Sequence, residues 1–484
     1  MPERWRIAKG AGPARCAPQC ATRSPPTATI RHAALAGALA ALLLAACGGG
    51  GGTAPAVGAA ESNPPLAAPA SCAVADQRNW LAGYMSDQYY WYDKLGQANG
   101  AAASMDSYFN SLLYQGVDRY SYTEPTAEFV QFFSTGTYVG FGYSLAWSDA
   151  SQTLLKVRHV EPLSPVGLAG LKRGETIVSI DGYNPAQIVA GTPGRVSSAG
   201  IPRNFVVRNP AGEQRSFSLV SAEYRYTSVP VSSVLTQSVG GLPVKVGYIV
   251  YQQFVNGSAG ELATAFNAFA AAGVKELIVD LRYNGGGSVN VARNLASMIG
   301  GSRLDGKTFV QMRYNARHPE YNFNYSFTSS AGALPALPLE GLSRVFIIGA
   351  EGTASASELV INGLRAHTQV VLIGATTYGK PYGFQPRDAC GITYNAVNFE
   401  SFNALGQGGY SSGIAPDCPA PDDLDHALGD IAEARLAATL AFMQTGSCPV
   451  SAAPLAVQRR AGAADRAPLS TAFGEVPVKR MLVD

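Results

Sequence analysis

The stretch SRVFIIGAEGTASASELVINGLRAHTQVVLIGATTYGKPYGFQ occupies residues 343–385 and decides the fold expected for the largest part of the chain. Apolar runs at Val345–Ile348 and Val370–Ile373 predict two buried strands, and the residues between them place their apolar side chains on one face of a helix. Strands alternating with helices indicate an α/β layer structure. The first turn places Ser355 at the start of the helix, and the second turn presents Lys380.

Ser355 has two explanations in this position. The free N–H groups and the dipole at a helix start would stabilise negative charge on a substrate oxygen, which suits a nucleophile. The spacing Ser355-x-x-Glu358 is also a capping box, which is a purely structural reason for a serine. From this motif alone the two explanations are equally good.

A serine nucleophile needs a base. His367 would lie about 18 Å further along the same helix at 1.5 Å per residue, so it cannot reach Ser355 unless the helix ends early and folds back. Lys380 follows the next strand, and the carboxyl ends of parallel strands meet at one edge of a sheet. A lysine acts as a base only when neutral, so burial must lower its pKa from about 10.4 by several units. Ser–Lys catalysis is a known variant of the triad.

Two other motifs compete with this one. Gly409-Tyr410-Ser411-Ser412-Gly413 matches G-x-S-x-G, which needs a strand before it and a helix after it, and Pro416 follows closely. If Ser411 were the nucleophile, the protein would be a carbohydrate- or lipid-acting hydrolase. Residues 374–380 match most of a P-loop, but Pro381 stands where a magnesium-binding Ser or Thr belongs, so we expect no nucleotide.

The rest of residues 223–450 fits one α/β block. We expect strands at Val246–Tyr251 and Lys275–Leu281, a helix begun by a capping box at Ser258 and Glu261 and ended by Gly273, and a terminal helix at Leu424–Met443. The second strand runs into a glycine-rich loop, residues 280–287, and another helix follows that loop.

The flanking regions have different compositions. Aromatic residues recur at helical spacing in residues 72–135, which predicts a small helical N-terminal domain with an aromatic core. Residues 451–484 are rich in Ala, Pro and Arg without periodicity, which predicts a disordered tail.

The first 46 residues read as a signal peptide. The apolar run at 33–46 has 14 residues, too short to span a bilayer. Its end, Leu44-Ala45-Ala46-Cys47, resembles the lipobox of bacterial lipoproteins, which implies acylation of Cys47; an ordinary secretory signal is the alternative. Residues 47–71 would then be a flexible tether. We expect a lipid-anchored protein of the bacterial cell envelope, at the outer membrane, facing the periplasm or the surface.

Four cysteines remain beyond the leader and the lipid site, namely Cys72, Cys390, Cys418 and Cys448. An even number suits disulfides in an oxidising compartment and permits three pairings. We favour Cys390–Cys418 and Cys72–Cys448. No CxxC or HxxxH spacing supports a metal site. With 36 basic and 34 acidic residues and no basic block, nucleic acid is not an expected partner.

Residues 136–222 resemble a PDZ domain. Tyr138-Val139-Gly140-Phe141-Gly142 stands where that family has its carboxylate-binding loop, and the segments 164–171 and 174–177 match its helix, turn and strand. Glycines let backbone N–H groups converge on a terminal carboxylate, and a sheet edge accepts the peptide as an added strand. A plain β-rich linker domain is the alternative.

The three motifs of the large block resemble those of the carboxy-terminal processing proteases, PDZ-containing serine peptidases with a Ser–Lys dyad. The loop Asp280-Leu281-Arg282-x-Asn284-x-Gly286-Gly287, the motif 354–358 and Gly379-Lys380 occur in the family order, with the same 25-residue gap from Ser355 to Lys380. The resemblance implies a multidomain α/β protein with a ClpP/crotonase-like core. Ser355 would be the nucleophile and Lys380 the base, with an oxyanion hole formed by the N–H groups of Ala356 and of Gly286 or Gly287.

The sequence departs from the family at two positions. Many members have a glutamine four residues after the lysine that orients it; here that position is Phe384, and Gln385 comes one residue later. Some members carry an aspartate 11 residues after the serine; here that position is Ala366. Neither change removes the dyad.

We therefore expect a lipid-anchored serine endopeptidase that needs no cofactor or metal and acts on proteins with free C-termini. A peptide-binding scaffold that keeps the fold without turnover is the alternative function.

Overall fold

The computed structural model describes residues 67–449, apart from 331, 333 and 337, and residues 480–482. Cys47, the predicted signal peptide and most of the predicted tether and tail lie outside these residues. Among the helices of the described residues, none is long and apolar enough to cross a membrane.

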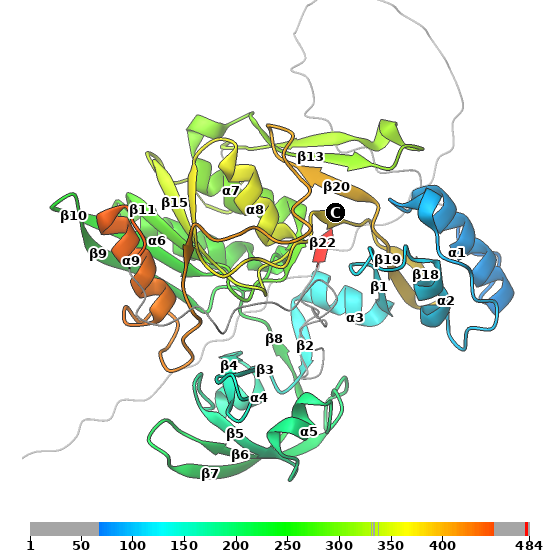
Figure 1. Cartoon of the computed structure of the whole chain (residues 1–484), viewed down its shortest axis with the longest axis horizontal. Coiled ribbons are helices and arrows are strands. Elements are labelled where there is room, and N and C mark those ends of the chain that lie inside the picture. The colour runs from blue at the N-terminus through cyan, green and yellow to red at the C-terminus, as the bar shows by residue number, and fades with distance from the viewer. Residues whose placement is uncertain (1–66, 331, 333, 337, 450–479, 483–484) are drawn as a thin grey trace, which may run out of the picture. The chain divides into compact units, whose positions relative to one another are not determined.

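A six-stranded sheet forms the centre of the large block (Figure 1). Its strands, in spatial order, are β21 (Cys418–Pro419), β16 (Gln369–Gly374), β15 (Arg344–Gly349), β11 (Glu276–Asp280), β10 (Leu242–Val250) and β9 (Val231–Val239). Only β9 is antiparallel to its neighbour; the other pairs are parallel. The predicted α/β layer structure with parallel strands is confirmed.

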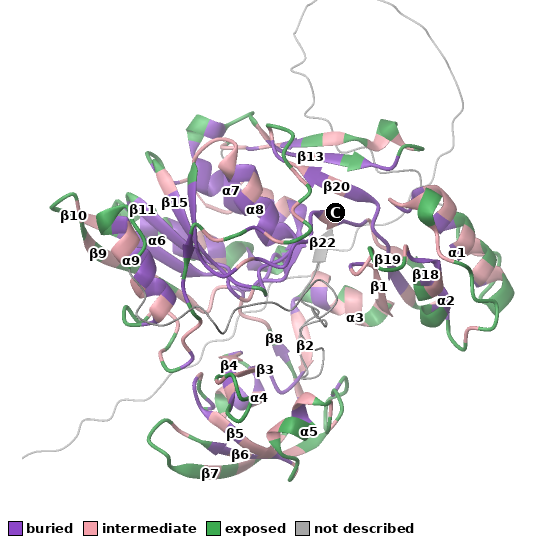
Figure 2. Ribbon diagram, in the orientation of Figure 1, coloured by how far each residue is buried: buried purple, intermediate pink, exposed green. Residues whose placement is uncertain are grey.

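Helices cover both faces of this sheet. The three helices α6 (Ala259–Ala272), α7 (Val289–Gly300) and α8 (Ala356–Arg365) share one apolar core with one face. Helix α9 (Ala434–Thr445) packs on the other face. Because both faces are covered, the inner strands β11, β15 and β16 are apolar runs that are almost wholly buried (Figure 2), whereas the edge strand β9 alternates half-buried and exposed residues.

Two local predictions in this block are wrong. Helix α9 begins at Ala434 rather than at Leu424, because Glu433 caps it by accepting the N–H of Leu436 at 3.0 Å. Ser258 does not cap α6: its hydroxyl donates to the Val255 carbonyl at 2.7 Å, and Glu261 instead accepts the N–H of Val229 at 2.7 Å.

Two smaller sheets contain other segments of the large block. The first contains β14 (Phe323–Ser326), β13 (Thr308–Tyr314), β20 (Phe399–Phe402) and β17 (Tyr382–Gly383) in this order. The second is a parallel pair of β12 (Gly286–Ser288) and β22 (Arg480–Leu482). The prediction of a tail without structure is therefore wrong for residues 480–482.

The N-terminal region is helical, as predicted, in α1 (Val74–Gln88) and α2 (Met105–Leu112). It continues into β1 (Tyr122–Pro125), which pairs with β19 (Ile392–Asn395), itself paired with β18 (Arg387–Ala389), and then into α3 (Thr126–Val130). Its apolar residues do not form a separate core. Leu81 and Phe109 share one buried cluster with Ala354 and Tyr378 of the large block.

Residues 137–225 form a β-domain with its own core. Its five antiparallel strands are β3 (Tyr143–Trp147), β4 (Leu155–Val160), β5 (Thr176–Ile180), β6 (Pro202–Arg208) and β7 (Gln214–Val220). The short helices α4 (Pro165–Leu168) and α5 (Pro185–Val189) accompany them, and β2 (Thr137–Gly140) pairs with β8 (Ala222–Arg225). Phe205 and Ile177 lie at the centre of its apolar cluster.

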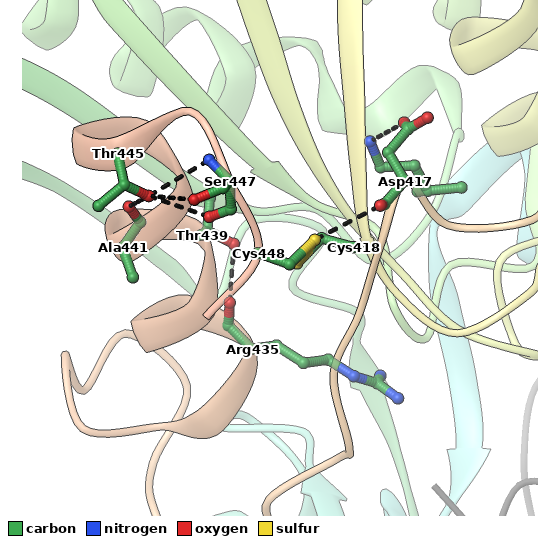
Figure 3. Close-up of a disulfide and its surroundings, with 9 residues drawn as sticks. Asp417, Cys418, Arg435, Thr439, Ala441, Thr445, Ser447 and Cys448 are labelled. Atoms are coloured by element: carbon green, nitrogen blue, oxygen red, sulfur yellow. Dashed lines mark hydrogen bonds between the residues drawn. A yellow bond between two sulfur atoms is a disulfide. The ribbon is translucent and has the colours of Figure 1, made fainter. Parts of the chain in front are cut away.

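The four cysteines form two disulfides, Cys72–Cys390 and Cys418–Cys448, so the favoured pairing is wrong. Cys72 precedes α1, which packs on the β18–β19 hairpin that carries Cys390 at its turn. Cys448 follows α9, and that helix lies on the sheet beside the strand of Cys418 (Figure 3). Packing of the helices, rather than proximity in sequence, selects the partners.

Candidate active site

The carboxyl ends of β11, β15 and β16 lie side by side, because Asp280 pairs with Ile348 and Gly349 pairs with Gly374. The glycine-rich loop, the Ser355 turn and the Lys380 turn follow these three strands directly. The sheet therefore brings the three predicted motifs to one edge.

Ser355 has a strained backbone. Its φ is +59° and its ψ is −117°, a conformation that residues other than glycine rarely adopt. The side chain is 0% exposed, and within the described residues its Oγ has no hydrogen-bond partner. A buried hydroxyl normally finds a partner, so a strained serine with an unbonded hydroxyl points to function.

Glu358 joins the two turns. Its Oε2 accepts the N–H of Ser355 at 2.9 Å and the N–H of Lys380 at 2.8 Å. The two amide nitrogens can therefore be no farther apart than the sum of these distances. Its Oε1 accepts the N–H of Gly379 at 2.7 Å and the hydroxyl of Thr377. Burial raises the pKa of the Glu358 carboxyl, and the four hydrogen bonds act in the opposite direction. Glu358, predicted only as one half of a capping box, thus links the Ser355 and Lys380 turns.

Lys380 is buried, and its Nζ lies 3.9 Å from the centre of the Phe384 ring. Gly379 shapes the turn before it: its φ is +86°, and a Cβ there would lie 2.4 Å from the Ser411 carbonyl oxygen. The sequence alone assigned no role to Phe384. Gln385 is half-buried, and its N–H donates to the Asn398 Oδ1 at 2.8 Å.

Asn284 holds the glycine-rich loop against the Ser355 turn. Its carbonyl accepts the N–H of Ala354 at 3.1 Å and the hydroxyl of Ser357 at 2.9 Å, on either side of Ser355. Its side-chain Oδ1 accepts the N–H of Gly286 at 2.9 Å. The N–H of Gly286 therefore already donates a hydrogen bond within the loop.

Of the predicted oxyanion donors, Gly287 and Ala356 differ from Gly286, because neither N–H is bonded to Asn284. Phe254 donates to the Gly286 carbonyl at 3.1 Å and accepts from the Ser288 N–H at 2.8 Å, so the polar groups of Gly287 point away from Phe254. Gly287 has φ +140°, and a Cβ there would lie 2.1 Å from the Phe254 oxygen, so only glycine fits. Ala356 is the first residue of α8, so its N–H has no partner within the helix.

A buried ion network fixes the start of the loop. Arg282 donates to Glu433 at 2.6 and 2.8 Å, to Asp280 at 3.0 Å and to Asp422 at 3.2 Å. Burial acts against the charge, but Asp280 and Glu433 outweigh it, so the pKa of Arg282 is raised well above its ordinary value. The arginine of the loop motif is thus structural.

The N-terminal region supports the Lys380 turn. Arg119 donates to the carbonyl oxygens of Ser411 at 2.9 Å and Tyr378 at 3.2 Å, and Tyr120 donates to that of Gly379 at 3.0 Å. Sequence reasoning missed both residues, because it placed them in a separate helical domain.

The competing motifs lack the required structure. His367 lies beyond the last residue of α8, and its Nε2 is 2.8 Å from the Thr308 carbonyl oxygen. Ser411 is exposed in a turn that no helix follows. The segment from Ala375 to Pro381 contains no helix, so the P-loop match has no phosphate-binding helix start.

The predicted carboxylate-binding loop lines a pocket of the β-domain. Gly140, Phe141 and Gly142 form one wall of the pocket. Ile188 of α5, Val196 and Arg203 lie among the other lining residues. Val139 lies in β2, where it pairs with Glu223 of β8, and it does not line the pocket. Both arginines among the lining residues are paired with carboxylates, Arg203 with Asp181 at 2.8 Å and Arg195 with Glu128 at 3.3 Å.

The β-domain also contacts the glycine-rich loop. Arg173 donates to the Tyr283 hydroxyl at 2.7 Å and to Asp422 at 3.3 Å, and Lys156 forms an ion pair with Asp425. Tyr283 directly precedes Asn284, which positions the loop. The β-domain is thus attached by polar contacts beside the site.

Two sequence profiles match the chain. Residues 245–419 match the one described as "Peptidase family S41", and residues 76–122 match "Peptidase S41 N-terminal domain".

Several relatives are similar over part of their length. The chain is 29% identical over 289 residues to carboxyl-terminal-processing peptidase 1, chloroplastic, of Arabidopsis thaliana, covering 57% of this chain and 54% of that protein. It is 28% identical over 253 residues to the carboxyl-terminal-processing protease of Synechocystis sp., covering 49% of this chain and 53% of that one. The chain spans little more than half the length of such relatives.

The fold also resembles a crystal structure assigned to the S41 proteases, from Bacteroides fragilis NCTC 9343. The TM-score is 0.60 at 23% identity, covering 75% of this chain and 96% of that one. This likeness supports the fold.

Proposed function

Because the chain contains both domains of peptidase family S41, we propose that it is a serine endopeptidase that uses a Ser355–Lys380 dyad. The observation that carries the proposal is the Ser355 turn: a strained, buried serine with an unbonded hydroxyl, joined through Glu358 to a buried lysine. Neither a cap nor a core position explains all of these features.

The reaction follows from the positions of the groups. The neutral Lys380 amine takes the proton of Ser355 Oγ while that oxygen attacks the peptide carbonyl carbon. The tetrahedral oxyanion accepts hydrogen bonds from the N–H groups of Gly287 and Ala356, and the start of α8 adds its dipole. The lysine ammonium then protonates the leaving amine, which gives an acyl-enzyme. Water hydrolyses this ester, with Lys380 again as the base.

Within this proposal the oxyanion hole uses Gly287 rather than Gly286. The Gly286 N–H is engaged by Asn284, whereas the Gly287 N–H points away from Phe254. Phe384, with its ring over the Lys380 amine, takes the orienting position expected of Gln385.

We propose that the β-domain is a PDZ domain that binds the C-termini of protein substrates. Its pocket, walled by Gly140, Phe141 and Gly142, has the composition that suits a terminal carboxylate and an apolar side chain. The lipobox at Cys47 leads us to propose further that a lipid anchors the protein in the bacterial envelope, where oxidising conditions suit its two disulfides.

The test is incubation of the wild type and Ser355→Ala with a peptide library, read by mass spectrometry. We expect cleavage by the wild type and none by Ser355→Ala, and we expect the wild type to prefer peptides that end in an apolar residue. Ser411→Ala is the matched control and should cleave like the wild type. Unchanged cleavage by Ser355→Ala would reject the dyad, and the absence of cleavage by any variant would favour a silent peptide-binding scaffold.

A further inference from the structure

Segment 480–482 lies on the strand that carries the proposed oxyanion donor. β22 pairs in parallel with β12, with Arg480 opposite Gly286, Met481 opposite Gly287 and Leu482 opposite Ser288 (β22 is red in Figure 1). These three residues lie far along the chain from every other part of the site, so the pairing is a long-range contact within one chain.

The edge of β12 that β22 occupies is the one that faces the reaction. The other edge is bonded to Phe254 through the Gly286 carbonyl and the Ser288 N–H. The backbone groups of Gly287 therefore point to the side of β22. An open strand edge accepts an extended peptide as an added strand, with main-chain hydrogen bonds supplying the affinity.

β22 also contacts β17, which begins at Tyr382, two residues after Lys380. β22 thus touches both the strand that holds Gly287 and the segment that follows the lysine. A substrate must place a carbonyl carbon at Ser355 with its oxygen toward the Gly287 N–H, so its chain must run along this same edge.

We propose that Arg480–Leu482 is an intramolecular occupant of the substrate strand position, so that the chain competes with substrates for its own site. This inference rests on the proposed peptidase function, because it takes the edge of β12 as the substrate edge. A tethered competitor can reach an effective concentration of about 1 mM. If the free segment binds with a Kd of about 0.1 mM, the tether weakens binding of an external peptide roughly tenfold.

The test uses full-length chains that carry Ser355→Ala, so that no peptide is turned over. In a parallel pair a residue bonds to the residues that flank its partner, so the partners expected for Gly287 are Arg480 and Leu482. Leu482→Pro removes the N–H that this pairing needs. Leu482→Val keeps the N–H and is the matched control.

The measurement is fluorescence anisotropy with a fluorescein-labelled peptide of residues 476–484, VPVKRMLVD. We expect the Leu482→Pro chain to bind it roughly tenfold more tightly than the Ser355→Ala parent and the Leu482→Val chain do. A peptide with proline in place of Leu482 should bind to none of the three. Equal affinities for all three chains, or no binding by any, would overturn the inference.

A kinetic arm separates this inference from the proposed function. With Ser355 restored, Leu482→Pro should lower KM for an external peptide roughly tenfold and leave kcat unchanged. Cleavage with an unchanged KM would reject the occupant and keep the peptidase. Tighter peptide binding without any cleavage would keep the occupant and reject the peptidase.

Discussion

The N-terminal helices and the β-domain are attached to the large block, in which we propose catalysis takes place and which is called the catalytic block below, in different ways. The helices share one apolar cluster with it, and this cluster includes both Phe109 and Ala354, the residue before Ser355. The β-domain keeps an apolar core of its own, centred on Phe205, and reaches the block through polar contacts such as Arg173 with Tyr283. The helices therefore share the apolar core on which the site is built, whereas the β-domain has a core of its own and only contacts the site region.

The two attachments also reach different groups of the site. The helical region ends in Arg119 and Tyr120, which hold the carbonyl oxygens around the Lys380 turn. The β-domain reaches Tyr283 within the glycine-rich loop, which also contains the proposed oxyanion donor Gly287. The Lys380 turn is thus held by the first region, and the glycine-rich loop is in contact with the second.

The largest expected effect distinguishes the two cores. Phe109→Ala removes a fully buried ring from the shared cluster and should lower the free energy of unfolding of the catalytic block by about 3–5 kcal/mol. Phe205→Ala removes an equally buried ring from the β-domain and should destabilise that domain alone. Differential scanning calorimetry of both variants measures this. A loss of stability in the catalytic block from Phe205→Ala would contradict separable cores.

The next effect concerns the base. Arg119→Ala removes charged hydrogen bonds to the Ser411 and Tyr378 carbonyl oxygens, each worth about 1.5–3 kcal/mol. We expect kcat to fall about tenfold or more, with little change in KM, because Arg119 supports the turn of the lysine and not the peptide. Arg119→Lys is the matched control and should recover part of the rate. An effect on KM alone would place Arg119 in substrate binding.

The fold of the catalytic block could be predicted from sequence because its strands are continuous apolar runs and its glycine-rich loop follows one of them. The residues 122–125 could not, because β1 owes its strand structure to pairing with β19, a partner far along the chain. The disulfide partners depended on the same long-range packing. Within the site, Ser355 and Lys380 stood in recognisable motifs, whereas Phe384 and Arg119 carry no local signal.

The pH dependence of stability distinguishes the two attachments, because only the polar attachment of the β-domain contains a carboxyl group, Asp422, with a strongly lowered pKa. Burial alone would raise the pKa of Asp422, but the guanidinium groups of Arg435, Arg282 and Arg173 hold it well below its ordinary value. A carboxyl with a lowered folded pKa stabilises the protein above its unfolded pKa, about 3.9, and loses this contribution as the pH falls below it.

The melting temperature of the wild type should therefore decrease as the pH is lowered below about 4. Asp422→Asn should be less stable at pH 7 and should show a weaker fall. Thermal melts at a series of pH values measure both. An identical pH dependence in the two proteins would show that Asp422 does not hold the attachment.

The smallest expected effect is that of Arg173→Ala. The change removes the hydrogen bonds to Tyr283 and Asp422 but leaves those between Arg282 and Glu433 in place, so we expect kcat/KM to fall about three- to tenfold, the equivalent of roughly 1 kcal/mol. Arg208→Ala, at an exposed position of the same β-domain, is the control and should have no effect. Steady-state kinetics with one peptide compare the two. Equal rates for both variants would mean that the β-domain contact does not influence the loop.

The central claim is that Ser355 and Lys380 form a nucleophile–base pair, and trapping of the acyl-enzyme tests it most directly. A peptide ester is mixed with the enzyme, the reaction is quenched in acid, and the digest is read by mass spectrometry. We predict an acyl adduct on Ser355 in the wild type and none in Lys380→Ala, which keeps the serine but lacks the base. An adduct on another serine, or an equal adduct on Ser355 in Lys380→Ala, would contradict the pair.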